Sequence, residues 1–302
     1  MELTYFQDKI KTLLPQINLR FNEPMSKHTS FRIGGPAEVM AFPKNGEELA
    51  DLLKMSRLLD CKTAILGAGT NVLAPDEGIT GLVICLKDSL DGMRQIDDTH
   101  IWVAGGVTMT RAAIYAANLG LSGLEFAHGI PGTVGGGVYM NAGAYGGEIC
   151  QVCTQVEAVD RRGNFVTLTN EEMEFSYRHS RLEEDGSIVL GAVFALIPKD
   201  PQEIRATMTD LQIRRKASQP LDLPSAGSAF KRPQGGYAAA LIDSAGLKGF
   251  RVGDAGVSEK HAGFVVNLGS ATADQVKTLL REVSDRVYDN SGIRLEPEVR
   301  IW

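Results

Sequence analysis

Hydrophobic positions follow two different periods along the first part of the chain. Apolar residues recur every three to four positions over 47–59 and 109–120, which is the spacing of a helix with one buried face. The second segment ends at a glycine, a common residue after a helix. Short apolar runs at 63–67 and 81–86 are typical of buried strands. The pattern therefore predicts that helices and strands alternate.

The next part of the chain begins with strands and continues with a helix. Residues 155–169 predict a hairpin that turns at 161–163, and the apolar run 188–198 predicts a buried strand. A helix is expected over 201–218, because the segment opens with a proline, which is favoured in the first turn. Prolines cluster after this helix, and we place a domain boundary near residue 199.

The residues beyond this boundary predict a compact α+β lobe. Helices are expected over 236–245 and 271–289, and strands over 263–268 and 295–301. Alternation gives the last strand two different faces. The apolar face would contain Leu295, Pro297, Val299 and Ile301, and the mostly charged face would contain Glu296, Glu298, Arg300 and Trp302.

Composition narrows the class of protein. With 302 residues and 43% hydrophobic content, the chain is long enough for two domains. A net charge of -6 argues against non-specific nucleic-acid binding. The N-terminal residues carry scattered charges without an apolar secretory segment, and the apolar run 188–198 is too short to cross a bilayer. We expect a cytoplasmic protein with no nucleic-acid or membrane partner and no need to form an oligomer.

Glycine is concentrated in the segment GIPGTVGGGVYMNAGAYGG at 129–147, which has eight glycines in nineteen positions. Its apolar residues argue against a flexible linker, so the segment is either a ligand cradle or a tight structural loop. A second glycine-rich turn, GAGTNVLA at 67–74, follows a predicted strand. It fails the dinucleotide fingerprint because Val72 stands where glycine is needed, but it still offers amides to an anion. Two such turns suggest a ligand with a diphosphate and a large body, such as a dinucleotide.

Several other kinds of chemistry find no support. The five histidines are far apart and lack a metal-binding spacing. Cys150 and Cys153 form a C-x-x-C without a second pair, and they are interpreted as core-facing or incidental thiols. The chain has no P-loop and no G-x-S-x-G elbow.

Three further stretches combine polar and charged residues in unusual contexts: SYRHS at 176–180, PSAGSAFKRP at 224–233 and LEPEVRIW at 295–302. On the pattern alone, Arg178 could be a surface cation, Ser228 a turn residue, and Glu298 with Arg300 an ordinary surface pair.

Taken in order, these motifs, together with GLEFAHGIPGTVGGG and GVSEKHAGFVVN, resemble the UDP-N-acetylenolpyruvoylglucosamine reductase family from about residue 28 to the C-terminus. The resemblance implies an α+β protein. Residues 1–199 would form an FAD-binding domain of the vanillyl-alcohol oxidase type, with two α+β subdomains at about 1–75 and 76–199, and residues 200–302 a substrate-binding domain.

The resemblance also implies a reaction, the FAD-dependent reduction of UDP-N-acetylenolpyruvoylglucosamine to UDP-N-acetylmuramate with NADPH, in peptidoglycan precursor synthesis. Hydride would pass through flavin N5, and the two substrates would use the same site in turn. By similarity Arg178 stabilises charge on the substrate carboxylate, Ser228 delivers the proton, and Glu298 orients or polarises the substrate.

Binding residues carry over by the same resemblance, with no metal among the ligands. For the cofactor they are Gly67, Ala68, Gly69, Thr70, Asn71, Gly129, Ile130, Gly132, Thr133, Gly135, Gly143, Arg215 and Arg300. Arg215 stands here for the basic cluster Arg214 to Lys216. One of these three residues is expected to contact an anionic ligand, and the sequence does not show which. The substrate would be bound by Tyr177, Lys231 and Arg232.

Two departures indicate the shorter subclass of the family. Only nine residues separate Arg178 from Ile188, too few for the substrate-covering loop of the longer form. Arg232 stands where the longer form has asparagine. Two other functions remain open: an FAD-dependent hydroxy-acid or alcohol oxidase on the same fold, and a sugar-nucleotide sensor that has lost catalysis.

Overall fold

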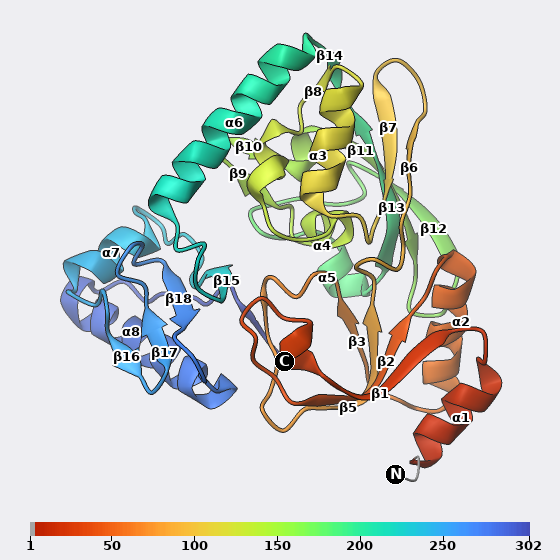
Figure 1. The fold of residues 1–302 in the computed structure, drawn as a ribbon, viewed down its shortest axis with the longest axis horizontal. Coiled ribbons are helices and arrows are strands. Elements are labelled where there is room, and N and C mark those ends of the chain that lie inside the picture. The colour runs from red at the N-terminus through yellow and green to blue at the C-terminus, as the bar shows by residue number, and fades with distance from the viewer. Residues whose placement is uncertain (1–3) are drawn as a thin grey trace. The chain divides into compact units, whose positions relative to one another are not determined.

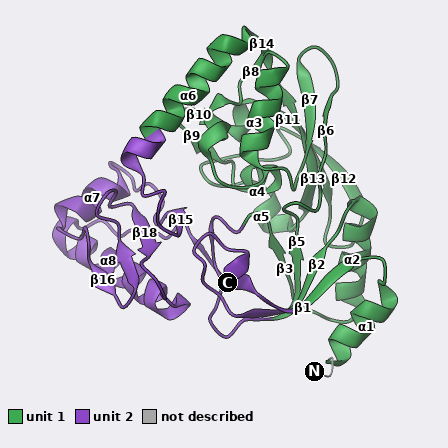
Figure 2. Ribbon diagram, in the orientation of Figure 1, with its two compact units in different colours: residues 1–21, 38–68, 80–214 green, residues 22–37, 69–79, 215–302 purple. Residues whose placement is uncertain are grey.

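The computed structural model describes residues 4–302 (Figure 1). The chain folds into two compact units (Figure 2). Unit 1 contains residues 1–21, 38–68 and 80–214, and unit 2 contains residues 22–37, 69–79 and 215–302. The units are defined by contacts in space and not by position in the sequence. The early segments 22–37 and 69–79 therefore belong to unit 2 together with the C-terminal residues. The boundary near residue 199, between a cofactor and a substrate domain, stays a prediction.

A four-stranded sheet with two helices forms the N-terminal part of the fold. Its strands, in spatial order, are β1 (Asn18–Pro24), β2 (Pro36–Phe42), β5 (Ile79–Cys85) and β3 (Thr63–Leu66). The helices are α1 (Tyr5–Leu13) and α2 (Gly46–Leu58). Ile10 and Leu49 of the helices and Val39 and Leu82 of the strands share one buried cluster. Asn45 caps α2, because its side chain accepts a hydrogen bond from the Glu48 amide, and this fixes where the predicted helix begins.

A five-stranded antiparallel sheet forms the second layer of unit 1. Its strands, in spatial order, are β12 (Phe165–Thr169), β11 (Cys153–Val159), β13 (Ile188–Ala195), β7 (His100–Ala104) and β6 (Met93–Gln95). The predicted hairpin at 155–169 is confirmed. The predicted strand 188–198 ends earlier, at Ala195; Ile197–Pro198 form β14 and pair with β8 (Leu121–Ser122).

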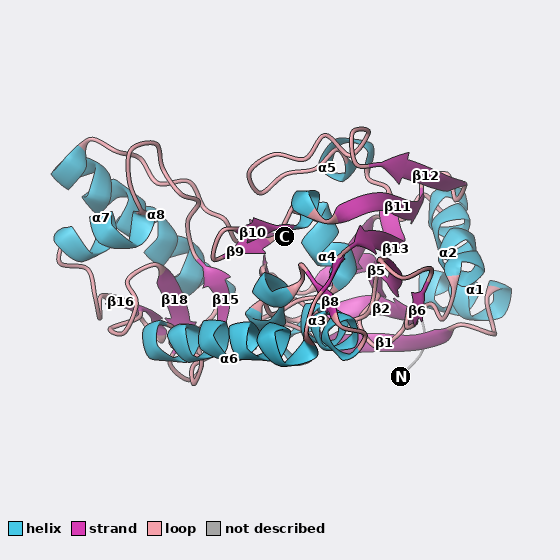
Figure 3. Ribbon diagram, turned by 90° about the horizontal axis from the view of Figure 1, so that it is seen from above, coloured by secondary structure: helices cyan, strands magenta, loops and turns pink. Residues whose placement is uncertain are grey.

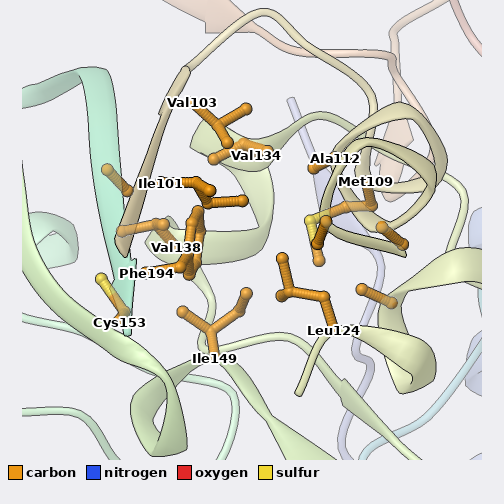
Figure 4. Close-up of a cluster of buried hydrophobic side chains, with 14 of the residues drawn as sticks. Ile101, Val103, Met109, Ala112, Leu124, Val134, Val138, Ile149, Cys153 and Phe194 are labelled. Atoms are coloured by element: carbon orange, nitrogen blue, oxygen red, sulfur yellow. The ribbon is translucent and has the colours of Figure 1, made fainter. Parts of the chain in front are cut away.

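Short helices cover this sheet and enclose its core (Figure 4). They are α3 (Met109–Asn118), η2 (Glu125–Gly129), α4 (Val134–Tyr139), η3 (Ile149–Gln151) and α5 (Leu182–Asp185). The two-residue strands β9 (Gly143–Ala144) and β10 (Gly147–Glu148) form a hairpin after α4. The core residues Met109, Val134 and Phe194, from two helices and a strand, lie in the same cluster.

The glycine-rich segment contains a helix, α4, with three consecutive glycines. Glycine inside a helix costs about 1 kcal/mol relative to alanine, so packing must require it. A Cβ at Gly135 would lie 3.0 Å from the Gly105 carbonyl oxygen, and one at Gly137 would lie 2.8 Å from Met109 Sδ. Gly136 is exposed, and its Cβ would meet only Thr133 Oγ1, at 3.5 Å. Two of the three glycines are therefore explained by helix packing within unit 1.

Unit 2 has a four-stranded antiparallel sheet in the order β15 (Ser225–Ser228), β18 (Phe264–Asn267), β17 (Ala255–Val257) and β16 (Arg251–Val252). Helices α7 (Ala238–Ser244) and α8 (Ala273–Ser291) lie together on one side of these strands (Figure 3). The early segments add the 3₁₀ helix η1 (Met25–Lys27) and β4 (Val72–Leu73), which pairs in parallel with β19 (Arg300–Ile301). Helix α6 (Pro201–Ser218), whose residues up to 214 belong to unit 1, has the predicted bounds.

The predicted strand 295–301 is wrong in most of its length. Only Arg300–Ile301 form a strand, and Pro297 makes an isolated bridge with Phe230. Leu295 and Val299 are buried as expected, but Pro297 and Ile301 are exposed. The segment changes its pairing partner between Glu298 and Arg300, and this change breaks the alternation.

None of the helices within residues 4–302 is long and apolar enough to span a membrane.

Alanine substitutions in α4 test the packing explanation. Gly137→Ala should lower the free energy of unfolding by about 1–3 kcal/mol, because buried Met109 must move. Gly136→Ala, the matched control, should raise it by about 0.4–1 kcal/mol, because an exposed helical glycine gains propensity without a clash. Urea unfolding of the apoprotein measures both. Equal effects of the two substitutions would contradict the explanation.

Candidate active site

The turn at 67–71 joins β3 to β4 and presents backbone amides. Within residues 4–302, no hydrogen bond uses the amide N–H of Gly67, Ala68, Gly69 or Asn71. Gly69 has a φ of +64°, and a Cβ on it would overlap the carbonyl oxygen of His28. The turn therefore requires glycine there, and its open amides suit an anion.

In unit 1, Gly67 packs against the residues that precede α4. A Cβ on Gly67 would lie 2.6 Å from Thr133 Oγ1. In the described part of the chain, the amides of Gly132 and Thr133 donate no hydrogen bond either. The fold thus brings open amides of Gly67, Ala68, Gly132 and Thr133 to one region of unit 1.

The sequence suggested that consecutive amides of the glycine-rich segment would bind a phosphate. The amides in the first turn of α4 do not have this role. The amides of Val134 and Gly135 donate to the carbonyl oxygens of Val107 and Gly105, both at 2.8 Å. The Gly136 amide donates to Thr133 Oγ1 at 3.3 Å. These amides are already satisfied by the protein. Gly135 serves the packing of the helix, while the open amides belong to the residues just before it.

Arg178 lies at the tip of a tight turn in unit 1. The turn is closed by reciprocal backbone hydrogen bonds between Ser176 and His179. Arg178 has a φ of +57°, which is uncommon for any residue other than glycine. Its Nη2 donates to the Gly143 carbonyl oxygen at 3.3 Å, and its guanidinium carbon lies 5.1 Å from the Tyr177 ring centroid. The turn therefore holds the arginine in one orientation.

Two buried polar side chains fasten this turn to the glycine-rich segment. Asn141 Nδ2 donates to the Ser176 carbonyl oxygen at 3.0 Å, and Ser180 Oγ donates to the Tyr139 carbonyl oxygen at 2.6 Å. Asn141 and Ser180 are 1% and 0% exposed. Neither residue was expected from the sequence to support the site, although a polar residue inside the motif GVYMNAGAY was the available signal.

In unit 2, Ser228 and Glu298 are held by paired backbone segments. The Glu298 amide donates to the Ala229 carbonyl oxygen at 2.9 Å, next to Ser228, and the Lys231 amide donates to the Glu296 carbonyl oxygen at 2.8 Å. Ser228 is exposed at the end of β15, and Glu298 is half-buried. Two residues separated by seventy positions in the sequence are thereby brought close together.

Asn71 links the glycine turn to this pair. Its Nδ2 donates to the Glu298 carbonyl oxygen at 3.1 Å, and its own carbonyl oxygen accepts a hydrogen bond from the Arg300 amide at 3.0 Å. Of the predicted site residues, unit 2 therefore gathers Asn71, Ser228, Glu298 and Arg300.

The predicted basic residues have different surroundings. Lys231 forms an ion pair with Glu296, and the guanidinium of Arg232 lies 4.1 Å from the Tyr237 ring centroid. Arg215 is only 9% exposed, whereas its neighbour Arg214 forms a surface ion pair with Asp210 at 2.8 Å. This contrast favours Arg215 within the basic cluster.

All four cysteines have thiol pKa values raised above the usual value. All four cysteines are free, and residues 4–302 contain no group of histidine, cysteine or acidic side chains able to hold a metal. Burial raises the pKa of Cys153 to about 12 and also raises the pKa of Cys150. The interpretation of Cys150 and Cys153 as core-facing or incidental thiols agrees with this geometry.

Comparisons with known proteins give the family. Residues 219–302 match the model of the UDP-N-acetylenolpyruvoylglucosamine reductase C-terminal domain, and residues 37–169 match an FAD binding domain. The UDP-N-acetylenolpyruvoylglucosamine reductase of Agathobacter rectalis is 46% identical, with 98% of each chain covered. The chain belongs to the UDP-N-acetylenolpyruvoylglucosamine reductase family.

Other relatives agree. The enzyme of the same name from Caldanaerobacter subterraneus subsp. tengcongensis is 46% identical, with 97% of each chain covered. The crystal structure of UDP-N-acetylenolpyruvylglucosamine reductase from Thermus caldophilus matches with a TM-score of 0.79 at 36% identity, covering 95% of this chain and 98% of that one.

Membership confirms the predicted class. The chain has the α+β FAD-binding fold of the vanillyl-alcohol oxidase type, and it is a flavin oxidoreductase of a family that uses FAD and NADPH in peptidoglycan synthesis. The open amides of Gly67, Ala68, Gly132 and Thr133 in unit 1 fit the diphosphate of FAD, because amide donors are what a phosphate needs.

Thiol titration tests the assignment of the cysteines. Burial raises the pKa of Cys61 and Cys85 to about 11 as well, so thiolates are scarce at pH 8 at these positions. The native protein should react slowly with Ellman's reagent, and the guanidinium-unfolded protein should release all four thiols without reductant. Release of only two thiols would indicate a disulfide, between Cys150 and Cys153 or elsewhere.

Proposed function

We propose that the chain reduces UDP-N-acetylenolpyruvoylglucosamine to UDP-N-acetylmuramate with NADPH, as a cytoplasmic enzyme of peptidoglycan precursor synthesis. The observation that carries the proposal is the backbone pairing of Glu298 with Ala229, which places the segment that carries Glu298 next to the segment that carries Ser228 in unit 2. The names of the relatives supply the substrate.

Bound FAD supplies hydride transfer between NADPH and the enolpyruvyl double bond. The protein then has two tasks at the substrate. Hydride addition at the terminal carbon moves negative charge onto the neighbouring carbon and its carboxylate. A cation must stabilise this charge, and a proton must reach the carbon.

Arg178 is the proposed cation. A guanidinium offers planar donors that match a carboxylate, and its charge is fixed at every working pH. The closed turn from Ser176 to His179 and the contact with Gly143 support a preorganised role, because an arginine held in place loses little entropy when charge develops.

Ser228 is the proposed proton donor, and Glu298 orients or polarises the same end of the substrate. A serine hydroxyl is a weak acid, but a carbanion is a far stronger base. The pairing of Glu298 with Ala229 and the contact of Asn71 with the Glu298 carbonyl support a fixed arrangement of the two side chains.

Binding roles follow the same reasoning. Gly67, Ala68, Gly69, Thr70, Asn71, Gly132 and Thr133 are proposed to hold FAD, with Arg215 and Arg300 as further contacts. Gly129, Ile130, Gly135 and Gly143 are proposed to shape the same region. Tyr177, Lys231 and Arg232 are proposed to bind the sugar nucleotide, and two of them lie three and four positions after Ser228.

A spectroscopic experiment tests the reaction directly. The purified protein should show flavin absorption bands that bleach on anaerobic addition of NADPH and return on addition of UDP-N-acetylenolpyruvoylglucosamine. Return with oxygen but not with the sugar nucleotide would favour the oxidase. Tight sugar-nucleotide binding by a protein that FAD cannot reconstitute would favour the sensor.

Ser228→Ala tests the proton donor. Flavin reduction by NADPH should keep its rate, whereas reoxidation by the sugar nucleotide should slow by about 10²–10⁴, because only the second half-reaction needs the proton. Stopped-flow absorbance measures each half-reaction. Ser225→Ala, which removes a hydroxyl from the same strand, is the matched control. Equal slowing of both half-reactions in Ser228→Ala would reject the assignment.

Arg178→Lys tests the need for planar donors. The charge remains but the paired donors are lost, so kcat/KM for the sugar nucleotide should fall about 10²–10³-fold, while the rate of flavin reduction by NADPH changes little. Steady-state and stopped-flow kinetics on the same preparation make the comparison. A variant with nearly the wild-type kcat/KM would show that any cation suffices.

A further inference from the structure

A loop at residues 25–35 belongs to unit 2 but lies outside both family models, which cover 37–169 and 219–302 (Figure 2). Two backbone hydrogen bonds close the loop: the Met25 amide donates to the Gly35 carbonyl oxygen at 2.9 Å, and the Ser26 amide donates to the Gly34 carbonyl oxygen at 3.1 Å. Neither family model explains what this loop does.

The loop is fastened to the C-terminal part of unit 2. Asn267, only 4% exposed, donates from Nδ2 to the Phe31 carbonyl oxygen at 3.0 Å. Ser30 Oγ donates to the Ser225 carbonyl oxygen at 2.6 Å. Phe31 and Ile33 are 1% and 2% exposed and lie in the main hydrophobic cluster of this unit. The loop is therefore built rigidly onto the elements that carry Ser228 and Glu298.

Arg32 stands between these two buried residues and is itself exposed. Its φ is +57°, a conformation that favours glycine. Thr29 holds the backbone there, because its carbonyl oxygen accepts from the Arg32 amide at 3.1 Å and its Oγ1 donates to the Ile33 carbonyl oxygen at 2.8 Å. Among residues 4–302, no ion pair or side-chain hydrogen bond involves the Arg32 guanidinium. A rigid loop thus presents a cation in a conformation that glycine would adopt more easily.

The loop lies directly against the glycine turn. The Ser30 amide donates to the Gly69 carbonyl oxygen at 3.0 Å, and a side chain on Gly69 would overlap the His28 carbonyl oxygen. Arg32 is two positions from Ser30 in the same closed loop. The amides of Gly69 and Asn71 donate to no described residue. Within unit 2, the loop that carries Arg32 therefore contacts the turn that carries these open amides.

The geometry points to Arg32 as a cation that binds the diphosphate of a ligand beside the turn that carries the open amides of Gly69 and Asn71. An arginine and backbone amides are complementary to phosphate oxygens, and a charge-assisted hydrogen bond is about twice as strong as a neutral one. Two ligands of the reaction carry a diphosphate, FAD and the UDP-sugar. The FAD assignment rests on the family, and the UDP-sugar assignment rests on the function proposed above.

Arg32→Gly separates ligand binding from folding. The substitution removes the cation and relaxes the backbone, so the melting temperature of the apoprotein should stay the same or rise. The dissociation constant for FAD, measured by flavin fluorescence quenching on the apoprotein, or the constant for UDP, measured by calorimetry on the holoenzyme, should rise at least tenfold. Arg32→Lys keeps the charge and should recover part of the affinity. Asp60→Gly, an exposed residue of unit 1 with a φ of +48°, is the matched control for relaxation and should leave both constants unchanged.

The outcomes are distinct. A rise in the FAD constant alone assigns Arg32 to the cofactor, and a rise in the UDP constant alone assigns it to the substrate. Unchanged constants in a folded Arg32→Gly protein overturn the proposal. If the wild-type holoenzyme fails to bind UDP, the proposed function fails and the FAD measurement still tests Arg32.

Discussion

The short backbone pairing of residues 229–231 with residues 296–298 is the constraint on which the candidate site in unit 2 depends. Two backbone hydrogen bonds form this pairing. Residues 296–298 therefore make an isolated bridge and not a regular strand. Because pairing is directional, it fixes where Glu298 lies relative to Ser228. The Asn71 side chain then extends the same arrangement to the glycine turn. Three distant segments are held together by a few polar contacts.

Glycine has two different purposes in unit 1. In α4, glycines let helices and strands approach each other, as at Gly135 and Gly137, and the amides of the first helical turn are satisfied by the protein. In the turns before α4 and after β3, the amides of Gly67, Ala68, Gly132 and Thr133 donate to no acceptor within residues 4–302. The glycine-rich segment thus combines glycines that packing requires with amides that no described acceptor uses. The hydrogen bonds distinguish the two groups, because the amides in α4 donate to protein acceptors and the amides before α4 do not.

Two arginines adopt left-handed backbone conformations, Arg178 in unit 1 and Arg32 in unit 2. In each case neighbouring hydrogen bonds close a tight turn, and buried anchors hold it: Ser180 beside Arg178, and Phe31 and Ile33 beside Arg32. On such a turn the closed backbone fixes the position from which the cation projects. This arrangement leaves the cation able to respond to an anionic ligand.

Local patterns in the sequence determined much of the fold. Helix α6 opens with a proline that favours the first helical turn, and the hairpin of β11 with β12 has clear turn residues, so their bounds were predictable. The motifs also carried the family and its cofactor. Tertiary structure decided which distant segments pair with each other, and a local sequence pattern does not contain this information. The alternation at 295–301 failed because the segment changes partners, and the early segments joined unit 2 through contacts such as that of Asn267 with Phe31. Hydrogen bonding between distant residues depends on the whole chain, and no window of sequence encodes it.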